Sequence, residues 1–220
     1  MKPKPESPGN LAAEKNINLL AARADELRQA LRQRHVHLLA DNTHSTFIQP
    51  VDGRSEFRLA FWDKEITISY PAFEMVDSSS NQSLNPGQQA LILYYFYTAD
   101  GAQPAGEWIS FSNLQDGLFY SKAFQGYTGN ELAKIFQNDL ARFERAASQL
   151  KGAHYSLGDA AFEFPLLPKL HLLVVSWQGD EDFPPNYQIL FDASVNHFLP
   201  TDACAIAGSM LTRRLINSSR

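Results

Sequence analysis

The chain has 220 residues, of which 44% are hydrophobic and 20% are charged, and its formal net charge is −5. A chain of this length and composition can fill one domain with a packed core, which excludes an intrinsically disordered protein. The negative charge gives no overall attraction to nucleic acid or to an anionic membrane surface, so we expect neither as a partner.

Cysteine content and the distribution of apolar residues narrow the setting. One cysteine, Cys204, cannot form an internal disulfide, a thiolate-only zinc site or a cluster held by several cysteines. No apolar run approaches the roughly 20 residues that cross a bilayer. The first ten residues are polar and proline-rich, unlike a secretory signal. We expect a cytoplasmic protein with a disordered lead-in over residues 1–10 and a single domain over residues 11–220.

The first third of the chain predicts a helix followed by a pair of strands. Apolar residues at helical spacing predict an amphipathic helix from Leu11 to about Arg34. Between Thr46 and Val76, aromatic and β-branched residues alternate with polar ones, which predicts two strands joined at Asp63-Lys64.

The middle third contains an ambiguous apolar run. Residues 90–97 are apolar on every side, so periodicity does not distinguish a buried helix from a buried strand. We favour a helix because Asn85-Pro86 is typical of a helix start. A short strand is predicted over residues 108–111, and a strong helix runs from Gly129 or Asn130 to about Leu150.

The last third returns to strands, over residues 161–164, 170–177 and 187–191. The latter two are joined by a turn at Gly179 to Asp182, which favours antiparallel pairing. A terminal helix follows, with Thr201 as its cap and Asp202 in its first turn. The predicted fold class is α+β, with a mostly antiparallel sheet or sheets packed against three to four helices.

Motifs for catalysis and nucleotide binding are missing from the sequence. There is no P-loop, no G-x-G-x-x-G, no G-x-S-x-G and no H-E-x-x-H. The sequence therefore favours a protein that is not an enzyme without deciding the matter, identifies no cofactor and indicates no metal site.

Residues 177–185 form the densest concentration of aromatic and acidic side chains. Asp180, Glu181 and Asp182 repel one another unless solvent, a cation or a basic partner offsets their charge. The segment is either a binding site or, as we favour, a solvated loop tip whose shape Phe183 and two prolines fix.

Asp192 differs from these acids because it ends an apolar strand and precedes a turn. It either caps that turn by accepting hydrogen bonds from backbone N–H groups, which we favour, or acts with His197 or Asp202 in acid–base or metal chemistry.

A third concentration, residues 120–130, joins aromatic and small polar residues before a predicted helix start. The free N–H groups of that start attract anions, and Lys122 would assist. The alternative, which we favour, is an aromatic core followed by a loop-to-helix cap.

Five blocks of sequence are similar to an uncharacterised prokaryotic family, the domain of unknown function numbered 3786. They are Gly106-Glu107-Trp108-Ile109-Ser110-Phe111, residues 120–124, Trp177-x-Gly-Asp-Glu-Asp-Phe-Pro-Pro, Ile189-Leu190-Phe191-Asp192 and Leu199-Pro200-Thr201-Asp202. The resemblance covers roughly residues 15–216 and implies a bacterial or archaeal source without an activity. Some family members carry an iron–sulfur module, which implies an association with redox or corrinoid proteins. The one cysteine of this chain cannot hold such a cluster.

Our first hypothesis is a non-catalytic small-molecule-binding or accessory module of a prokaryotic cytoplasmic pathway. Apolar walls with a few polar groups are typical of ligand pockets. The candidate ligand-binding residues are Trp177, Asp180, Asp182, Phe183, Asp192, Tyr120 and Tyr127.

Two alternatives belong to other classes of function. A metal-assisted hydrolase would use Asp180, Asp182, Asp192 and His197, whose oxygen ligands favour magnesium, calcium or manganese. It requires at least three of these groups to converge in one cleft. A protein-interaction module, accessory to corrinoid or iron–sulfur proteins, would instead expose an aromatic patch without a cleft.

Overall fold

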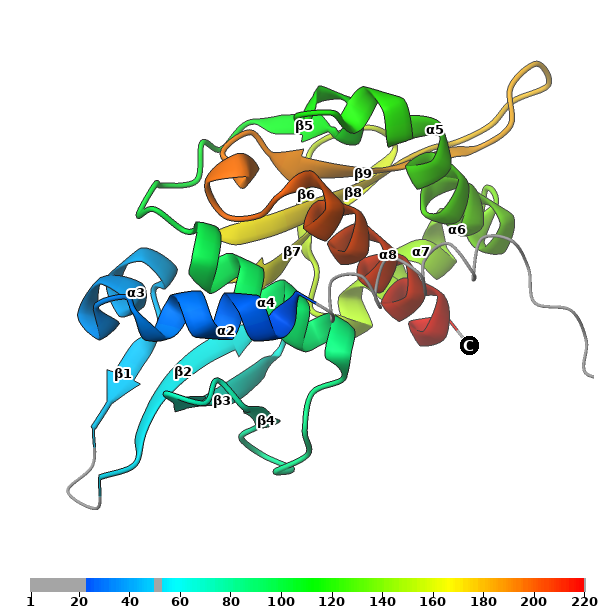
Figure 1. Ribbon diagram of the computed structural model, residues 1–220. Helices are drawn as coiled ribbons and strands as arrows, with labels where there is room; N and C mark the ends of the chain where they lie inside the picture. Colours follow the sequence, from blue (N-terminus) through cyan, green and yellow to red (C-terminus); the bar gives the residue numbers. More distant parts are fainter. Residues whose placement is uncertain (1–22, 50–52, 220) are drawn as a thin grey trace, which may run out of the picture.

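Two antiparallel sheets form the framework of the protein, and helices pack between and beside them (Figure 1). The computed structural model describes residues 23–49 and 53–219, so the predicted lead-in lies outside the described residues. Sheet A has the order β1 (Thr46–Ile48), β2 (Ser55–Phe61), β3 (Lys64–Tyr70), β4 (Met75–Asp77). Sheet B has the order β5 (Trp108–Ser110), β9 (Asn186–Asp192), β8 (Leu170–Trp177), β7 (Ala160–Leu167), β6 (Ala153–Tyr155). The α+β class and the single domain are confirmed.

The helices lie along the junction of the two sheets and on one side of sheet B (Figure 1). None of the helices in the described residues is long and apolar enough to cross a membrane. The α-helices are α2 (Ala24–Arg32), α3 (Val36–Thr43), α4 (Pro86–Thr98), α5 (Gly117–Tyr127), α6 (Gly129–Phe136), α7 (Leu140–Gln149) and α8 (Thr201–Ser218), and two short 3-10 helices are η1 (Phe111–Asn113) and η2 (Val195–His197).

The edge strands of both sheets are short. Within the described residues, β1 and β4 border sheet A, β5 and β6 border sheet B, and each of the four has three residues. The inner strands have seven or eight residues. The long strands therefore have neighbours on both sides over part or all of their length.

Sheet A confirms the predicted pair of strands. In β2 the apolar residues Phe57, Leu59 and Phe61 are buried and alternate with the exposed residues Arg58 and Ala60. They lie opposite Ile68, Ile66 and Lys64 of β3, so their side chains share one face. That face joins the main core.

The apolar run at residues 90–97 is helical, as predicted, and forms most of α4. Asn85 accepts a hydrogen bond from the N–H of Gln88 (3.0 Å), and Gln88 Oε1 accepts one from the N–H of Asn85 (3.1 Å). This reciprocal capping and Pro86 in the first turn fix where the helix begins. Residues 90–96 of α4 are all buried, because helices and both sheets surround them.

Sheet B has a core on each face. Its inner face contributes Phe162, Val174, Ile189 and other side chains to the main core. A smaller cluster on the outer face is covered by partly buried aromatic residues. Among them, Trp108 of β5 and Tyr155 of β6 come from opposite edges of the sheet, yet their ring centroids are 5.8 Å apart. The sheet must therefore curl strongly.

The prediction of one continuous helix over residues 129–150 is wrong, because the chain leaves the helical path after Phe136. Gln137 has φ of 48° and ψ of −131°, which interrupts the helical hydrogen bonds. Asp139 then caps α7 by accepting a hydrogen bond from the N–H of Arg142 (2.9 Å). The result is two helices, α6 and α7.

Two further helix ends differ from the sequence prediction. Residues 120–127 belong to helix α5, whereas the sequence predicts a segment that precedes a helix. Thr201 begins α8, but its hydroxyl donates to the carbonyl of Gln115 (2.6 Å) instead of capping the helix. Asp202 lies in the first turn as predicted. The helix predicted from Leu11 is confirmed only as α2, and its earlier part lies outside the described residues.

Candidate functional site

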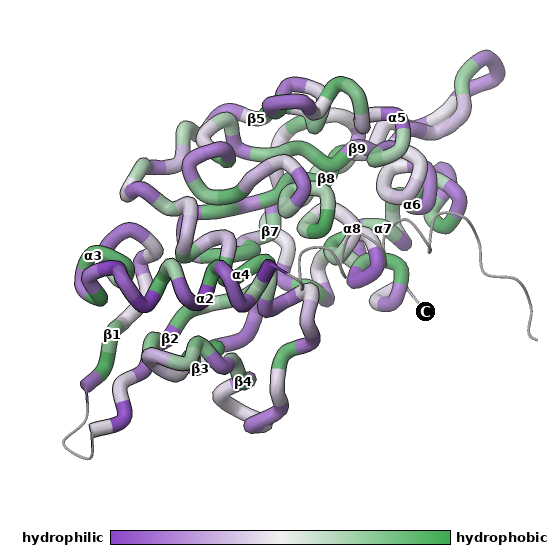
Figure 2. The backbone as a smooth tube through the Cα atoms, in the orientation of Figure 1, coloured by the Kyte–Doolittle hydropathy of each residue, from purple (hydrophilic) through white to green (hydrophobic). Residues whose placement is uncertain are grey.

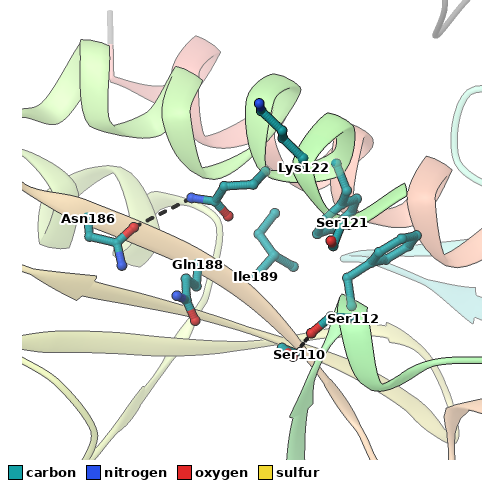
Figure 3. Close-up of a pocket in the computed structure, with 10 residues that line it drawn as sticks. Ser110, Ser112, Ser121, Lys122, Asn186, Gln188 and Ile189 are labelled. Atoms are coloured by element: carbon teal, nitrogen blue, oxygen red, sulfur yellow. Dashed lines mark hydrogen bonds between the residues drawn. The ribbon is translucent and has the colours of Figure 1, made fainter. Parts of the chain in front are cut away.

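A pocket of about 450 Å³ lies between α5, η1 and the first half of β9 (Figure 3). η1 and α5 follow one another in the sequence, whereas β9 lies far from both, and all three meet at one edge of sheet B. Figure 3 shows Ser121 and Lys122 on the helix side, with Asn186 and Gln188 across from them on the strand. Ser110 and Ser112 close a third side.

The helix side of the pocket is held in place by an aromatic stack. Phe124 of α5 lies parallel to Phe111 of η1, with ring centroids 4.2 Å apart and planes inclined by 10°. Both rings are buried and form part of the pocket wall. Ser121, Lys122 and Gln125 follow on neighbouring positions of one face of α5, because residues three and four apart are adjacent on a helix. The stack therefore sets where their polar groups lie.

The strand side depends on where β5 ends. β5 pairs only with residues 190–192 of β9, which leaves the preceding residues without a strand on that side. There Gln125 Nε2 donates to the carbonyl of Tyr187 (2.9 Å). The main chain of Gly129 also packs against this carbonyl, because an added Cβ would lie 2.0 Å from the oxygen. Helices α5 and α6 thus close the edge at Tyr187, and the pocket remains between this closure and β5.

Alternation along β9 brings two amides to the pocket. Asn186 and Gln188 point to the outer face of the sheet, whereas Tyr187 and Ile189 are buried in the main core. Asn186 is exposed and Gln188 is half-buried. The first half of β9 therefore presents two amides beside an exposed lysine.

The polar groups of the pocket are only partly engaged with one another. Ser110 Oγ lies 2.7 Å from Ser112 Oγ and donates to Asn113 Oδ1 (2.6 Å). Among the described residues, no hydrogen bond or ion pair engages the side chain of Gln188 or Lys122. These two groups are free to bind a ligand.

The chemistry of the lining suits binding. It contains hydroxyls, amides and one ammonium group, but no carboxylate, histidine or cysteine. The pocket walls thus offer hydrogen bonds and one positive charge, and they contain no carboxylate or imidazole for acid–base work. Over residues 23–49 and 53–219, no group of three histidine, cysteine, aspartate or glutamate side chains is placed to hold a metal ion.

The predicted acidic turn forms the loop between β8 and β9. Asp180 Oδ1 accepts hydrogen bonds from the N–H groups of Asp182 (2.9 Å) and Phe183 (2.8 Å), and these bonds lower the pKa of Asp180. Phe183 is 71% exposed. The loop extends beyond the sheet, and Figure 2 shows it turning hydrophilic at its tip. None of these residues lines the pocket.

Asp192 holds a turn together at the other end of β9. Its carboxylate accepts hydrogen bonds from the N–H groups of Ala105 (2.8 Å), Gly106 (2.7 Å) and Ser194 (2.9 Å), and from the Ser194 hydroxyl. Burial raises the pKa of Asp192, but the hydrogen bonds from Ser194, Ala105 and Gly106 outweigh it and lower the pKa below its usual value. The geometry is that of a cap.

The remaining predicted residues are aromatic. Trp177 ends β8 and packs on the outer cluster of sheet B. Tyr120 is exposed on α5, whereas Tyr127 packs edge-on against Phe124. Burial raises the pKa of Tyr127 to about 12. Neither tyrosine is among the pocket residues.

The structure does not bring together the four residues of the hydrolase hypothesis. Asp180 and Asp182 precede β9 and Asp192 ends it, so the seven-residue strand holds them about 20 Å apart. His197 pairs instead with Asp100, whose carboxylate lies 2.7 Å from its Nδ1.

Sequence reasoning found Lys122 but missed the other side of the pocket. The available signal was Asn186 and Gln188, two amides at the outward positions of a strand whose other residues before Asp192 are apolar or aromatic. Ser110 and Ser112 carry no such signal, because serine is common at strand ends and turns.

A family model described as "Domain of unknown function (DUF3786)" matches residues 43–214, well over half of the chain. No curated protein and no solved structure matches the chain.

Proposed function

The chain belongs to the DUF3786 family, whose description names no activity, and we propose that it is a non-catalytic binding module. Its site is the pocket between α5 and β9, and its ligand is a small hydrogen-bonding molecule with a negatively charged group. We further propose that it acts in a prokaryotic cytoplasmic pathway, in line with its resemblance to a prokaryotic family.

One observation carries the proposal. Lys122 and Gln188 border a pocket of about 450 Å³ and have no partner among the described residues, while the lining contains no acid. Ligand pockets commonly have volumes of roughly 300–1,000 Å³ and contain a few polar groups for orientation. The volume of this pocket lies in that range, and Lys122 and Gln188 supply hydrogen-bond donors that no other described residue uses.

The charge of the lining selects the ligand class. An ammonium group without a neighbouring carboxylate favours an anion, and serine hydroxyls and amide N–H groups donate to its oxygens. A carboxylate or a phosphate group has the matching acceptors. A cation would meet Lys122 and no carboxylate, so it is disfavoured.

The proposal is tested by a thermal-shift screen with inorganic phosphate, acetate and a panel of phosphorylated and carboxylated metabolites. A ligand that binds the native state raises the apparent melting temperature by mass action. We expect at least one anion to raise it, and we expect Lys122→Ala and Gln188→Ala to reduce the shift.

The matched control is Lys134→Ala, which removes a lysine that is ion-paired with Glu131 on α6 and lies outside the pocket. Its shift should equal that of the wild type. A shift that survives in both pocket variants, or the absence of any shift across the panel, would contradict the proposed site.

A further inference from the structure

The pocket face of α5 continues into an apolar surface. Leu118 and Phe119 lie four and three residues before Lys122, so their side chains are neighbours of Lys122 on the helix. Leu118 also precedes Ser121 by three and Gln125 by seven residues, which places it on the same face as the polar side of the pocket.

These apolar side chains are unusually exposed. Leu118 is 70% and Phe119 is 85% exposed, and Tyr120 beside them is 62% exposed. The buried residues of α5 are Gly117 and Phe124. The helix thus anchors through Phe124 while it presents large apolar groups to solvent, an arrangement that marks an interaction site more often than a structural one.

The polar pocket and the apolar surface together form one amphipathic site. From this continuity, and from the unpaired charge of Lys122, we propose that the ligand is a monomeric anionic amphiphile. Its carboxylate or phosphate head group occupies the pocket at Lys122 and Gln188, and its apolar chain lies along Leu118 and Phe119. This inference rests on the proposed function and names the ligand class of that same site.

Burial of the chain determines how affinity depends on chain length. Each fully buried methylene strengthens binding by about fourfold, and a methylene on an open helix surface gains roughly half of that free energy, or about twofold. An anion without a chain gains only the head-group contacts. Affinity therefore increases steadily from short to long ligands, while the contribution of Lys122 stays constant.

The experiment is calorimetric titration of the protein with acetate, hexanoate and decanoate, and with inorganic phosphate and octyl phosphate, below their micelle concentrations. We expect decanoate to bind roughly tenfold or more tightly than hexanoate. Lys122→Ala should weaken hexanoate and decanoate by the same factor. The double variant Leu118→Ser, Phe119→Ser should abolish the dependence on chain length and leave the binding of short anions unchanged.

Leu38→Ser is the matched control, because Leu38 is another exposed apolar residue but lies on α3, away from the pocket. It should leave the chain-length dependence intact. All substituted side chains are exposed, so the variants should melt like the wild type in the absence of ligand.

The outcomes separate the two proposals. If short anions bind through Lys122 but chain length has no effect, the amphiphile inference is overturned and the proposed function stands. If no anion of any length binds, the proposed function fails as well. Binding to anionic lipid vesicles without binding to monomeric amphiphiles would also overturn the inference, because the occupant would then be a membrane surface.

Discussion

Asp192 shows how one buried carboxylate joins two chain segments at a turn. Its oxygens accept hydrogen bonds from residues 105 and 106 before β5 and from Ser194 after β9. Without the carboxylate, these N–H groups would lose their acceptors in a partly buried setting, which costs roughly 1–3 kcal/mol per unsatisfied group. Asp192 therefore fixes where β5 joins β9, next to the pocket.

We expect Asp192→Asn to lower the free energy of unfolding by about 2 kcal/mol at pH 7, measured by urea denaturation. The folded pKa of Asp192 is lower than the unfolded value of about 4. Its contribution is therefore complete above pH 4 and is lost as pH falls through the folded pKa. The difference in the free energy of unfolding between wild type and variant should therefore shrink as the pH falls below 4. Asp182→Asn on the exposed loop should change the free energy of unfolding neither at pH 7 nor at this low pH.

At the scale of the elements, the break between α6 and α7 is held by hydrogen bonds to distant parts of the chain. Tyr187 Oη donates to the carbonyl of Gln137 (3.1 Å). The side chain of Asn138 accepts a hydrogen bond from the N–H of Gly179 (2.7 Å) and donates one to the carbonyl of the same residue (3.2 Å). The break thus ties the helices to the start of the β8–β9 loop.

Gln137 occupies backbone dihedral angles that a type II′ turn normally reserves for glycine. Holding a residue with a side chain there costs about 1–3 kcal/mol, part of which the greater unfolded-state entropy of glycine offsets. We expect Gln137→Gly to raise the free energy of unfolding by about 1 kcal/mol in urea denaturation. Gln137→Ala keeps the strain and should give no gain. A loss of stability in the glycine variant would show that the Gln137 side chain contributes more than the strain costs.

The sequence identified elements wherever the local pattern and the tertiary environment agreed. The strands of sheet A follow from alternation, and α4 follows from its Asn-Pro start. The break at Gln137 was missed because Ile135, Phe136 and Leu140 keep helical spacing across it. Helix α5 was missed because its two buried residues, seven apart, leave too little apolar periodicity to detect.

At the scale of the whole molecule, the turn between β2 and β3 joins the two sheets. The N–H of Trp62 donates to the carbonyl of Leu166 in β7 (2.9 Å). Arg214 of α8 donates to Asp63 (2.6 Å), and its guanidinium carbon lies 5.1 Å from the Trp62 ring centroid. Burial raises the pKa of Asp63, but the hydrogen bond and charge of Arg214, with the charge of Lys151, lower it overall.

We expect Arg214→Ala to lower the free energy of unfolding by about 1 kcal/mol, since both the half-exposed ion pair and the cation–aromatic contact are weakened by solvent. Urea denaturation measures the change, and NMR titration should show the pKa of Asp63 rising. Arg213→Ala removes the exposed neighbouring arginine and should change neither quantity. Equal effects of the two substitutions would argue against a specific role for the contacts of Arg214 with Asp63 and Trp62.

The candidate site is assembled by the fold of the whole molecule, and the sequence therefore predicted only part of it. Ser110 and Lys122 are close in the sequence, but Gln188 of β9 lies beside them only once sheet B has formed. The prediction instead relied on polar and aromatic residues that are clustered along the chain, such as Asp180 to Asp182, and these extend into solvent. Without knowledge of which strand neighbours β9, the position of Gln188 beside α5 could not be derived.

The three-residue edge strands have a consequence for the behaviour of the protein in a crowded solution. A long exposed edge is a template on which other chains can add strands, and this is a common start of aggregation. Here β1, β4, β5 and β6 offer few unpaired backbone groups, and α5 and α6 close the edge of β9 at Tyr187. Self-association through these sheet edges is thereby disfavoured.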